Sequence, residues 1–192
     1  MSNLIQPQEG IVFDHKILPA LSDMKSFEKF LESPLDMGIL MGFHVAQLGP
    51  LTAKMRDAGK QTLIHLDLIK GLSGDEYGTE FLCQTLPIAG VISHHQNVVS
   101  VAKKKKKLAI LRMFLIDSLS LGKSLEIAKK IEPDYIEMLP ALAFGAVDRI
   151  KRECNIPLIG GGLIESKEEI DQCFQAGMVA VTTSRQSLWM YQ

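Results

Sequence analysis

Short apolar runs recur along the whole chain and alternate with longer amphipathic stretches. The runs are Ile17–Leu21, Met37–Phe43, Thr62–Leu66, Gly90–Ser93, Leu108–Phe114, Asp134–Leu139, Pro157–Gly160 and Met178–Thr182. Runs of this length predict β-strands, and the amphipathic stretches between them predict helices. Since most of the runs do not alternate strictly between apolar and polar residues, we expect strands that are buried on both faces of a parallel sheet.

Helix start and stop signals stand between the runs. Ser22 is placed to cap the helix after the first run, and Ser118 or Ser120 the helix after the fifth. Ser166, with acidic residues in the following turn, predicts the start of the helix after the seventh run, and Gly177 predicts its end. Each unit of run and helix takes about 22 residues, which is close to the minimum for a strand, a helix and two short loops.

Eight such units predict the fold. Eight parallel strands, each followed by a helix, close into a compact (β/α)8 barrel of the TIM type, in the α/β class. The alternative is an open, doubly wound sheet. That fold usually carries a glycine-rich turn after its first strand, whereas the segment Ile17–Phe27 contains no glycine. We therefore favour the barrel.

Composition indicates one domain with a buried core. The chain has 192 residues, 46% of them hydrophobic, which excludes a disordered protein. No segment has the composition of a linker, so we expect a single barrel domain over residues 1–192, with 1–16 as a leading segment. No apolar run reaches the roughly 18 residues that a membrane span requires, and the N-terminus does not resemble an export signal. We expect a cytoplasmic protein without membrane contact.

The histidine pair and the three cysteines do not predict a metal site or a disulfide framework. His94 and His95 are adjacent, and neighbouring residues on a strand point to opposite sides, so we expect no metal site. Cys83, Cys154 and Cys173 lack the spacing of a disulfide framework and are interpreted as small core residues. No nucleophile motif such as G-x-S-x-G is present, so these residues do not predict nucleophilic catalysis.

The strongest functional signal follows the seventh and eighth runs. Gly160, Gly161 and Gly162 are consecutive, and such glycines let backbone N–H groups approach an anion closely. Thr183 and Ser184 add hydroxyl donors at the end of the next run. In this barrel the loops after strands seven and eight are the frequent phosphate site. The alternative is a tight turn at the glycines, with the hydroxyl residues capping the last helix.

Four charged residues fall near the predicted carboxyl ends of the strands: Asp67, Lys70, Arg112 and Glu137. They could hold a small hydroxylated ligand, or they could form an internal ion-pair network. His65 precedes Asp67 by two positions and therefore shares its strand face. We interpret His65 as a hydrogen-bonded core histidine.

One local departure from charge balance remains. The net charge is −1 and the isoelectric point is near 6.5, which excludes a globally basic nucleic-acid binder but leaves room for a local patch. A run of five lysines ends one predicted helix: Lys103, Lys104, Lys105, Lys106 and Lys107. The run is either a solvated face that complements the negative helix terminus or a small contact patch for RNA phosphates.

Six motifs together resemble one known family. They are HLDLIKGL from His65, DEYGTEFL from Asp75, FLIDS from Phe114, PDYIEMLP from Pro133, GGGLI from Gly160 and AVTTS from Ala180. The combination resembles the bacterial glycerol-3-phosphate responsive antiterminators, also described as glycerol uptake operon antiterminator regulatory proteins. The resemblance runs from about Ile17 to Trp189.

The resemblance implies a regulator and no catalysis. Proteins of this family are barrels that respond to glycerol 3-phosphate and act on the leader of a messenger RNA, so that transcription passes a terminator. For this chain, the resemblance implies that glycerol 3-phosphate is the effector ligand and that no cofactor is bound. It also implies that the partner is the leader mRNA of glycerol-utilisation genes. Carried onto this chain, Gly161, Gly162, Thr183 and Ser184 become the phosphate candidates. Asp67, Lys70, Arg112 and Glu137 become weaker candidates for the glycerol part. The resemblance assigns no RNA surface residue by residue, so RNA contact by the five lysines stays a local hypothesis from their charge.

Two other classes stay open at this point. A phosphosugar isomerase, aldolase or synthase on the same barrel would also use the phosphate loops, with Asp67 or Glu137 as general base and Lys70 as its partner. A purely structural barrel would leave the paired loops unexplained. The oligomeric state, a homo-oligomer included, is not determined by the sequence.

Overall fold

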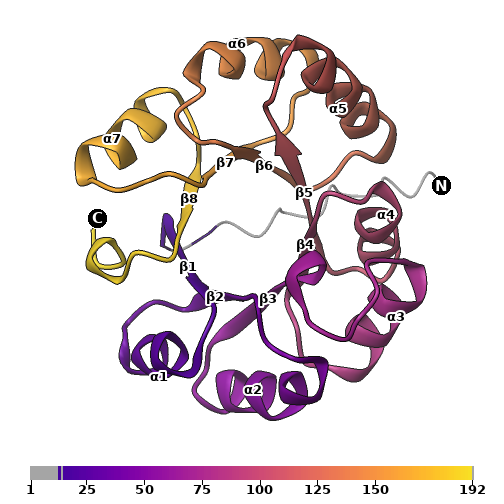
Figure 1. Cartoon of the computed structure of the whole chain (residues 1–192), viewed down its shortest axis with the longest axis vertical. Coiled ribbons are helices and arrows are strands. Elements are labelled where there is room, and N and C mark those ends of the chain that lie inside the picture. Colours follow the sequence, from indigo (N-terminus) through magenta and orange to yellow (C-terminus); the bar gives the residue numbers. More distant parts are fainter. Residues whose placement is uncertain (1–12, 14, 192) are drawn as a thin grey trace, which may run out of the picture.

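The chain folds into a closed ring of eight parallel strands (Figure 1). The computed structural model describes residues 13 and 15–191. The strands are β1 (Ile17–Leu21), β2 (Met37–Leu40), β3 (Gln61–His65), β4 (Gly90–Ser93), β5 (Leu108–Phe114), β6 (Tyr135–Leu139), β7 (Leu158–Gly161) and β8 (Ala180–Thr183). Each strand pairs with its neighbours in sequence, and β8 pairs with β1 to close the ring. The predicted (β/α)8 fold is confirmed.

In the described residues, seven α-helices surround the strands. They are α1 (Met24–Glu32), α2 (Val45–Asp57), α3 (Glu76–Thr85), α4 (Gln96–Lys104), α5 (Ser118–Ile131), α6 (Phe144–Glu153) and α7 (Lys167–Gln175). A short 3-10 helix, η1 (Leu66–Leu68), follows β3. After β8 the described chain forms only the 3-10 helix η2 (Gln186–Leu188), which lies between α7 and α1 (Figure 1). The eighth α-helix that the repeating pattern predicts is therefore absent from the described residues.

Two of the predicted helix caps are wrong. Asp23, not Ser22, caps α1, because its carboxylate accepts the N–H of Ser26. Asp117, not Ser118 or Ser120, caps α5, because its carboxylate accepts the N–H of Ser120. The Ser120 hydroxyl in turn accepts the N–H of Asp117. In each helix a serine three residues after the cap, Ser26 in α1 and Ser120 in α5, completes the reciprocal pair of hydrogen bonds. Ser166 caps α7 as predicted, in a reciprocal box with Glu169.

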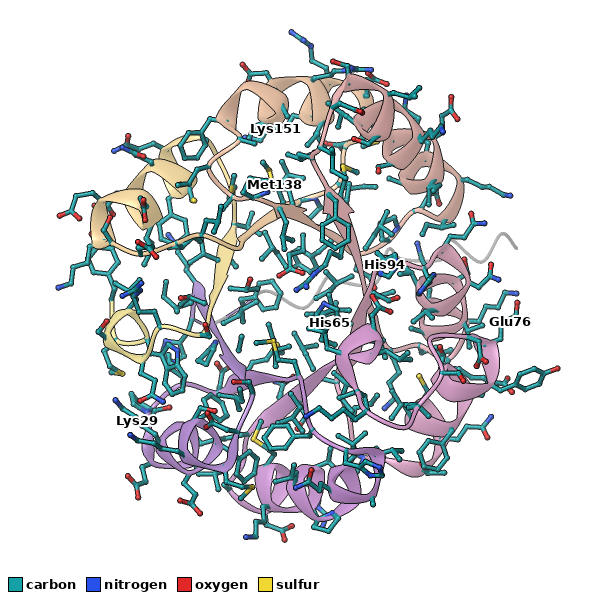
Figure 2. All side chains as sticks on the ribbon, in the orientation of Figure 1. Lys29, His65, Glu76, His94, Met138 and Lys151 are labelled. Atoms are coloured by element: carbon teal, nitrogen blue, oxygen red, sulfur yellow. The ribbon has the colours of Figure 1, made fainter. Side chains whose placement is uncertain are left out.

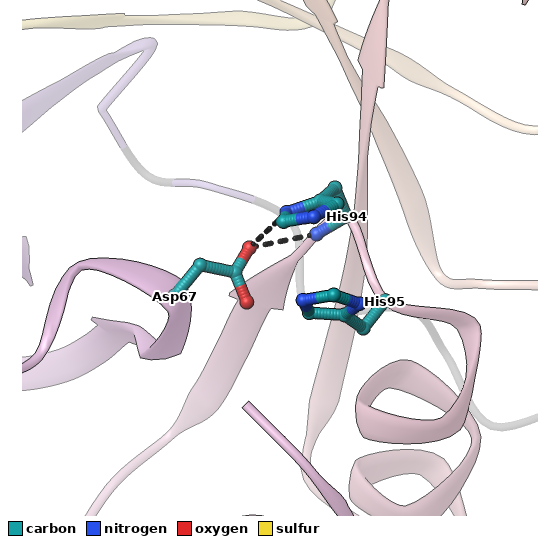
Figure 3. A group of neighbouring side chains, drawn as sticks. All are labelled: Asp67, His94 and His95. Carbon is teal, nitrogen blue, oxygen red and sulfur yellow. Dashed lines mark hydrogen bonds and ion pairs between the residues drawn. The ribbon is translucent and has the colours of Figure 1, made fainter. Parts of the chain in front are cut away.

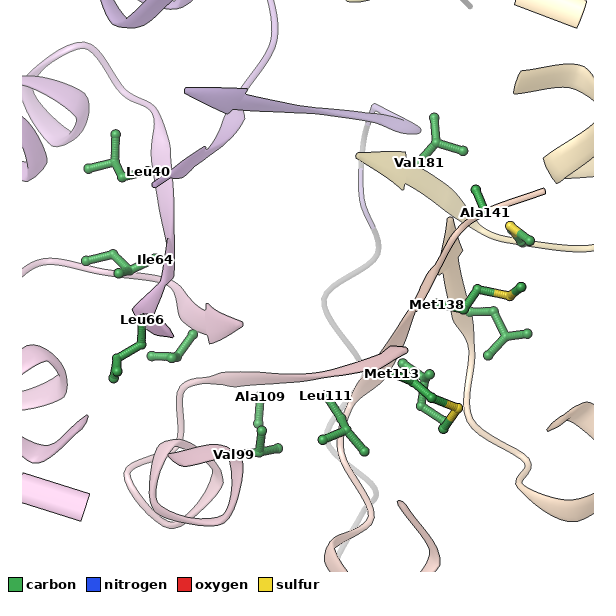
Figure 4. Close-up of a cluster of buried hydrophobic side chains, with 14 of the residues drawn as sticks. Leu40, Ile64, Leu66, Val99, Ala109, Leu111, Met113, Met138, Ala141 and Val181 are labelled. Carbon is green, nitrogen blue, oxygen red and sulfur yellow. The ribbon is translucent and has the colours of Figure 1, made fainter. Parts of the chain in front are cut away.

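The core consists of two apolar layers, one outside the ring of strands and one inside it. The outer layer packs the strands against the helices, and Figure 4 shows Leu40, Leu111, Met113 and Met138 in it. The inner layer takes apolar side chains from every strand: Leu18, Met37, Ile39, Leu63, Ile92, Leu108, Ile110, Tyr135, Ile159 and Ala180. Phe13 packs on Tyr135 with ring centroids 4.8 Å apart. The barrel is therefore filled with side chains and is not a pore.

Three further predictions concern the leading segment, the cysteines and membrane-spanning helices. Most of the predicted leading segment 1–16 lies outside the described residues. Cys154 and Cys173 are buried and Cys83 is half-buried, and all three are free thiols, in line with their interpretation as core residues. In the described part of the chain, no helix combines the length and apolar character needed to cross a bilayer.

Candidate functional site

A polar layer lies inside the barrel above the apolar inner layer. Side chains two residues apart on a strand share a face, so the residue two positions after each inner apolar residue also points inward. This places His65 after Leu63, Arg112 after Ile110 and Glu137 after Tyr135. Gly161 and Thr182 follow Ile159 and Ala180 in the same way. These positions lie at the carboxyl ends of the strands, where barrels carry their functional sites.

A buried carboxylate organises this layer. Arg112 Nε donates to Glu137 Oε2 at 2.8 Å, and Thr182 Oγ1 donates to Glu137 Oε1 at 2.7 Å. The Glu137 side chain is 0% exposed and that of Arg112 is 14% exposed. The ion-pair interpretation therefore holds for Arg112 and Glu137. Because Glu137 fixes one side of the guanidinium, the Arg112 side chain is held in one orientation.

Gly161 makes room for that carboxylate. A Cβ atom at this position would come within 2.8 Å of Glu137 Oε1 and 2.9 Å of Thr182 Oγ1. Contacts this short would displace the hydrogen-bonded side chains of Glu137 and Thr182, so a glycine suits this position. Gly161 was predicted as a phosphate residue for its backbone N–H, but it does not line the cavity described below. The structure gives a different reason for a glycine there, which is the space that the Glu137 side chain takes.

His65 lies in the same layer without a hydrogen-bond partner. Its side chain is buried, and neither ring nitrogen has a partner among the described residues. Figure 2 shows it on the inner side of the ring of strands. Burial, reinforced by the positive charge of Arg112, lowers the pKa of His65 to about 4. His65 is therefore a neutral core histidine, but the predicted hydrogen bond is not present.

This pKa predicts a loss of stability in weak acid. The imidazole protonates near pH 6.5 in the unfolded chain and near 4 in the folded one, so unfolding takes up a proton between these values. His65 should lower the free energy of unfolding by about 2 kcal/mol between pH 7.5 and pH 5. Urea unfolding at the two pH values tests this. His65→Leu should remove this part of the pH dependence, and an unchanged slope in that variant would contradict the assignment.

A cavity opens at the mouth of the barrel next to this layer. It has a volume of about 370 Å³. Its polar lining comes from Arg112, Gly162, Glu165, Thr182, Thr183, Ser184 and Arg185, and its apolar lining from Ala20, Met41, Leu68, Leu139, Leu163 and Ile164. Thus Gly162, Thr183 and Ser184, from the predicted phosphate loops, meet in one place. Arg112 joins them from β5.

The two loops are shaped by different devices. Gly162 and Leu163 have φ angles of 72° and 59°, so the chain turns sharply where it leaves β7. After β8, Thr183 Oγ1 accepts the N–H of Arg185 at 3.1 Å, and Trp189 Nε1 donates to the Thr183 carbonyl at 3.2 Å. The alternative role as a cap for an α-helix does not apply to Thr183, since only η2 follows. The Arg185 side chain contacts Glu165 at 3.1 Å across the mouth.

Asp67 and Lys70 lie elsewhere. Asp67 accepts hydrogen bonds from Ser93 Oγ at 2.5 Å and from His94 Nδ1 at 2.7 Å. Burial raises the pKa of Asp67, but these hydrogen bonds outweigh it and leave the pKa below its usual value. Lys70 is exposed, and neither residue lines the 370 Å³ cavity. The structure therefore places one of the four charged candidates, Arg112, on the cavity wall, with Glu137 behind it.

The lysine run lies at the opposite end of the barrel, between the end of α4 and the start of β5. Lys103 donates to the Glu132 carbonyl, Lys105 pairs with Glu80 at 2.8 Å, and Lys107 donates to the Ile88 carbonyl at 2.7 Å. Lys104 and Lys106 are exposed. Three of the five lysines therefore hold parts of this chain together, and any contact of the run with RNA would be made far from the mouth.

A second cavity, of about 410 Å³, opens near the amino ends of β1 and β2. It is lined mainly by apolar side chains, among them Leu35, Phe174 and Trp189. It gathers no cluster of charged groups like that at the mouth. Of these two cavities, the one lined by the loops after β7 and β8 is the better candidate for a phosphorylated ligand.

Sequence reasoning missed two polar residues of the mouth. Thr182 was counted as the end of an apolar run, although its register on β8 opposite Gly161 places it beside Glu137. Arg185 was passed over because it lies one residue beyond the hydroxyl pair. A cation directly after a phosphate-loop motif is a signal that could have found it.

A family model and two solved structures indicate the family that the sequence motifs resemble. A family model described as glycerol-3-phosphate responsive antiterminator matches residues 17–189. A crystal structure of a glycerol uptake operon antiterminator regulatory protein from Listeria monocytogenes is 39% identical, with a TM-score of 0.90 over 93% of this chain and 97% of that chain. An antiterminator-related protein from Thermotoga maritima is 28% identical, with a TM-score of 0.79 over 90% and 96%.

Other matches are less specific. The Escherichia coli (strain K12) protein YgcP, described as uncharacterized, is 27% identical over 95% of this chain and 96% of its own length. A putative deoxyribose-phosphate aldolase from Coccidioides immitis and a deoxyribose phosphate aldolase from Aeropyrum pernix are 9 and 12% identical, each with a TM-score of 0.67, which shows the fold alone.

Proposed function

The chain belongs to the glycerol-3-phosphate responsive antiterminator family, and on this basis we propose that it binds glycerol 3-phosphate at the barrel mouth and so controls antitermination at the leader mRNA of glycerol-utilisation genes. The single observation that carries the proposal is the 370 Å³ cavity in which Gly162, Thr183 and Ser184 meet two arginines. We infer a regulator and not an enzyme.

The phosphate end of the ligand is assigned to the loops after β7 and β8. Gly162 exposes backbone where no side chain shields it, and Thr183 and Ser184 offer hydroxyl groups. Arg185 adds a cation that lies directly at these loops. Hydrogen bonds from charged donors to a phosphate oxygen are shorter and stronger than neutral ones, so Arg185 should contribute a large share of the affinity.

The glycerol end is assigned to Arg112. Among the four charged candidates, Arg112 alone lines this cavity, and Glu137 holds its guanidinium from behind. The apolar side chains of Met41, Leu68 and Leu139 complete the wall. A pocket with fixed polar groups and apolar walls suits a small polyol phosphate, which has few carbons to bury and several oxygens to satisfy.

Control of RNA requires two states that bind the ligand differently. Glycerol 3-phosphate can shift the population only by its difference in affinity for those states. The loop Gly71–Asp75 at the same end of the barrel is the proposed element that responds. Because the net charge is −1, attraction to RNA must come from a local surface and not from the protein as a whole.

Glycerol 3-phosphate is expected to stabilise the folded chain. At a concentration of 100 times its dissociation constant it should add about 2.7 kcal/mol, or about 5–10 °C in Tm for a chain of this length. Glycerol and inorganic phosphate, each with half of the contacts, should shift Tm less. The same ligand should then change retention of leader RNA at a fixed salt concentration. No Tm shift would contradict ligand binding, and a Tm shift without any RNA effect would contradict the regulatory part.

A matched pair of variants locates the site. Arg185→Gln should weaken glycerol 3-phosphate binding about 10- to 100-fold, since it removes a charged donor. Arg56→Gln is the control, because Arg56 is likewise an exposed arginine in one surface ion pair, with Asp57, at the far end of the barrel. Both variants should unfold like the wild type. Turnover of a phosphosugar by the wild-type protein would favour the enzyme alternative.

A further inference from the structure

Three potential metal ligands converge outside the proposed ligand cavity. Asp67, His94 and His95 each present one ligand atom, and these atoms all lie within 4.8 Å of one another. Figure 3 shows the carboxylate of Asp67 and the two imidazoles pointing toward one another. The ring centroids of His94 and His95 are only 3.9 Å apart. None of the three residues lines the cavity assigned to glycerol 3-phosphate.

The expectation that the two histidines point apart is wrong. It assumed that both lie on a strand, but β4 ends at Ser93. His94 is already in the loop, and His95 stands at the N-cap position of α4, where its side chain makes no capping hydrogen bond. The chain turns between strand and helix at this point, so the two neighbouring side chains fall on the same side.

The carboxylate is held in place by its surroundings. Ser93 Oγ donates to Asp67 Oδ1 at 2.5 Å, and the His94 backbone N–H donates to Oδ2 at 2.9 Å. The His95 N–H in turn donates to Ser93 Oγ at 3.0 Å. Outer-shell hydrogen bonds of this kind orient the ligands of metal sites. The Asp67 side chain is 9% exposed, whereas that of His94 is 43% exposed and can move.

The distances between the ligand atoms lie on both sides of those that a small cation requires. Donor atoms of a tetrahedral site lie about 3.3 Å apart when the metal bonds are about 2.0–2.1 Å. In the structure Asp67 Oδ2 and His94 Nδ1 are 2.7 Å apart and share a hydrogen bond. A metal ion that replaces the shared proton has to push these two atoms apart and draw the His95 nitrogen closer. Rotation of the exposed imidazoles supplies both movements.

We propose that Asp67, His94 and His95 form a binding site for a divalent transition-metal ion of the zinc type. Two imidazoles and one carboxylate are ligands that zinc, cobalt and nickel accept, whereas magnesium and calcium prefer sites built from oxygen atoms. Three protein ligands leave one position open for water or another oxygen ligand. The site is distinct from the ligand cavity, and its test does not depend on glycerol 3-phosphate.

The Ser93 hydroxyl does not make this cluster a nucleophilic centre. In a catalytic triad the histidine stands between the serine and the carboxylate and takes the serine proton. Here Asp67 stands between Ser93 and His94, so the hydroxyl donates to a carboxylate and not to an imidazole. The arrangement suits the orientation of a ligand set, with Ser93 as the positioning residue.

The test is a titration with Co²⁺ alone, on untagged protein that has been stripped with EDTA and dialysed. Binding of one ion per chain should give visible d–d absorption, and Zn²⁺ should displace it. His95→Gln and His94→Gln should each raise the Co²⁺ dissociation constant at least about 100-fold, and Ser93→Ala about 10- to 100-fold. His95→Gln removes no side-chain hydrogen bond among the described residues, so this variant should fold normally.

The control is His44→Asn. His44 is an exposed histidine that follows β2 at the same end of the barrel and caps α2, and Asn preserves a cap. This variant should bind Co²⁺ like the wild type. The proposal is overturned if the wild-type chain binds no stoichiometric Co²⁺, or if both histidine variants bind it unchanged. It is also overturned by a thiolate charge-transfer band, which would place the ion on a cysteine.

Discussion

Replacing Arg112 by Met is expected to lower the free energy of unfolding by about 3–5 kcal/mol. Glu137 is 0% exposed, and its two oxygens accept hydrogen bonds from Arg112 and Thr182. Without the guanidinium, a buried carboxylate keeps one neutral partner and no compensating charge. Urea unfolding at neutral pH measures the loss, and glycerol 3-phosphate binding should be lost with it because Arg112 also lines the cavity.

The double variant Arg112→Met with Glu137→Met separates the two effects. Removing both charges leaves an apolar pair of similar size, and such replacements are often neutral or stabilising. The double variant should therefore recover most of the stability but not the ligand binding. A loss below about 1 kcal/mol in Arg112→Met alone would show that Glu137 is not dependent on the ion pair.

Replacing Trp189 by Ala should cost about 3–5 kcal/mol, the usual range for a large buried aromatic side chain. Trp189 is 2% exposed and packs edge-on against Phe30 with ring centroids 6.5 Å apart. It belongs to the short segment that stands between α7 and α1 in place of an eighth helix. The substitution should also weaken ligand binding, because the indole N–H holds the Thr183 carbonyl at the mouth.

The variant Trp189→Phe separates the contribution of packing to the free energy of unfolding from that of the indole hydrogen bond. It keeps most of the apolar contact but removes the indole N–H that donates to the Thr183 carbonyl, and loss of this one hydrogen bond should cost about 0.5–1.5 kcal/mol. Trp189 is the single tryptophan of the sequence, so unfolding of all three proteins has to be followed by far-ultraviolet circular dichroism. Equal stability of the wild type and Trp189→Ala would mean that the C-terminal segment is not part of the folding unit.

The repeat of strand and helix was predictable because it depends on local patterns. A buried parallel strand is a short apolar run, and each helix shows an amphipathic face, so the eight units can be counted without any contact between them. The caps were less predictable. Asp23 and Ser26 are each competent to cap a helix, and the backbone path decides which residue caps and which answers. The regular repeat also predicted an eighth α-helix, and the described residues after β8 form only η2.

The site was predictable where it depends on the order of loops. Thr183 and Ser184 meet Gly162 because strands seven and eight are neighbours in any barrel of this kind. The register of β8 against β7 could not be predicted from the order of the loops. Whether Thr182 or Thr183 faces Glu137 depends on which residues of β8 lie opposite β7, and a shift by one residue reverses every side chain.

By itself, therefore, the sequence determined the number of strands, the closure of the barrel and the loops that carry glycines and hydroxyls, since these follow from periodicity and chain order. The tertiary structure alone decided which polar residues meet. It paired Arg112 with Glu137 across two strands, left His65 unpartnered beside them, and brought Asp67 to His94 and His95. The physical reason is that these contacts join residues about 25 positions or more apart, and only the pleat, the register and the ends of the strands set their distances.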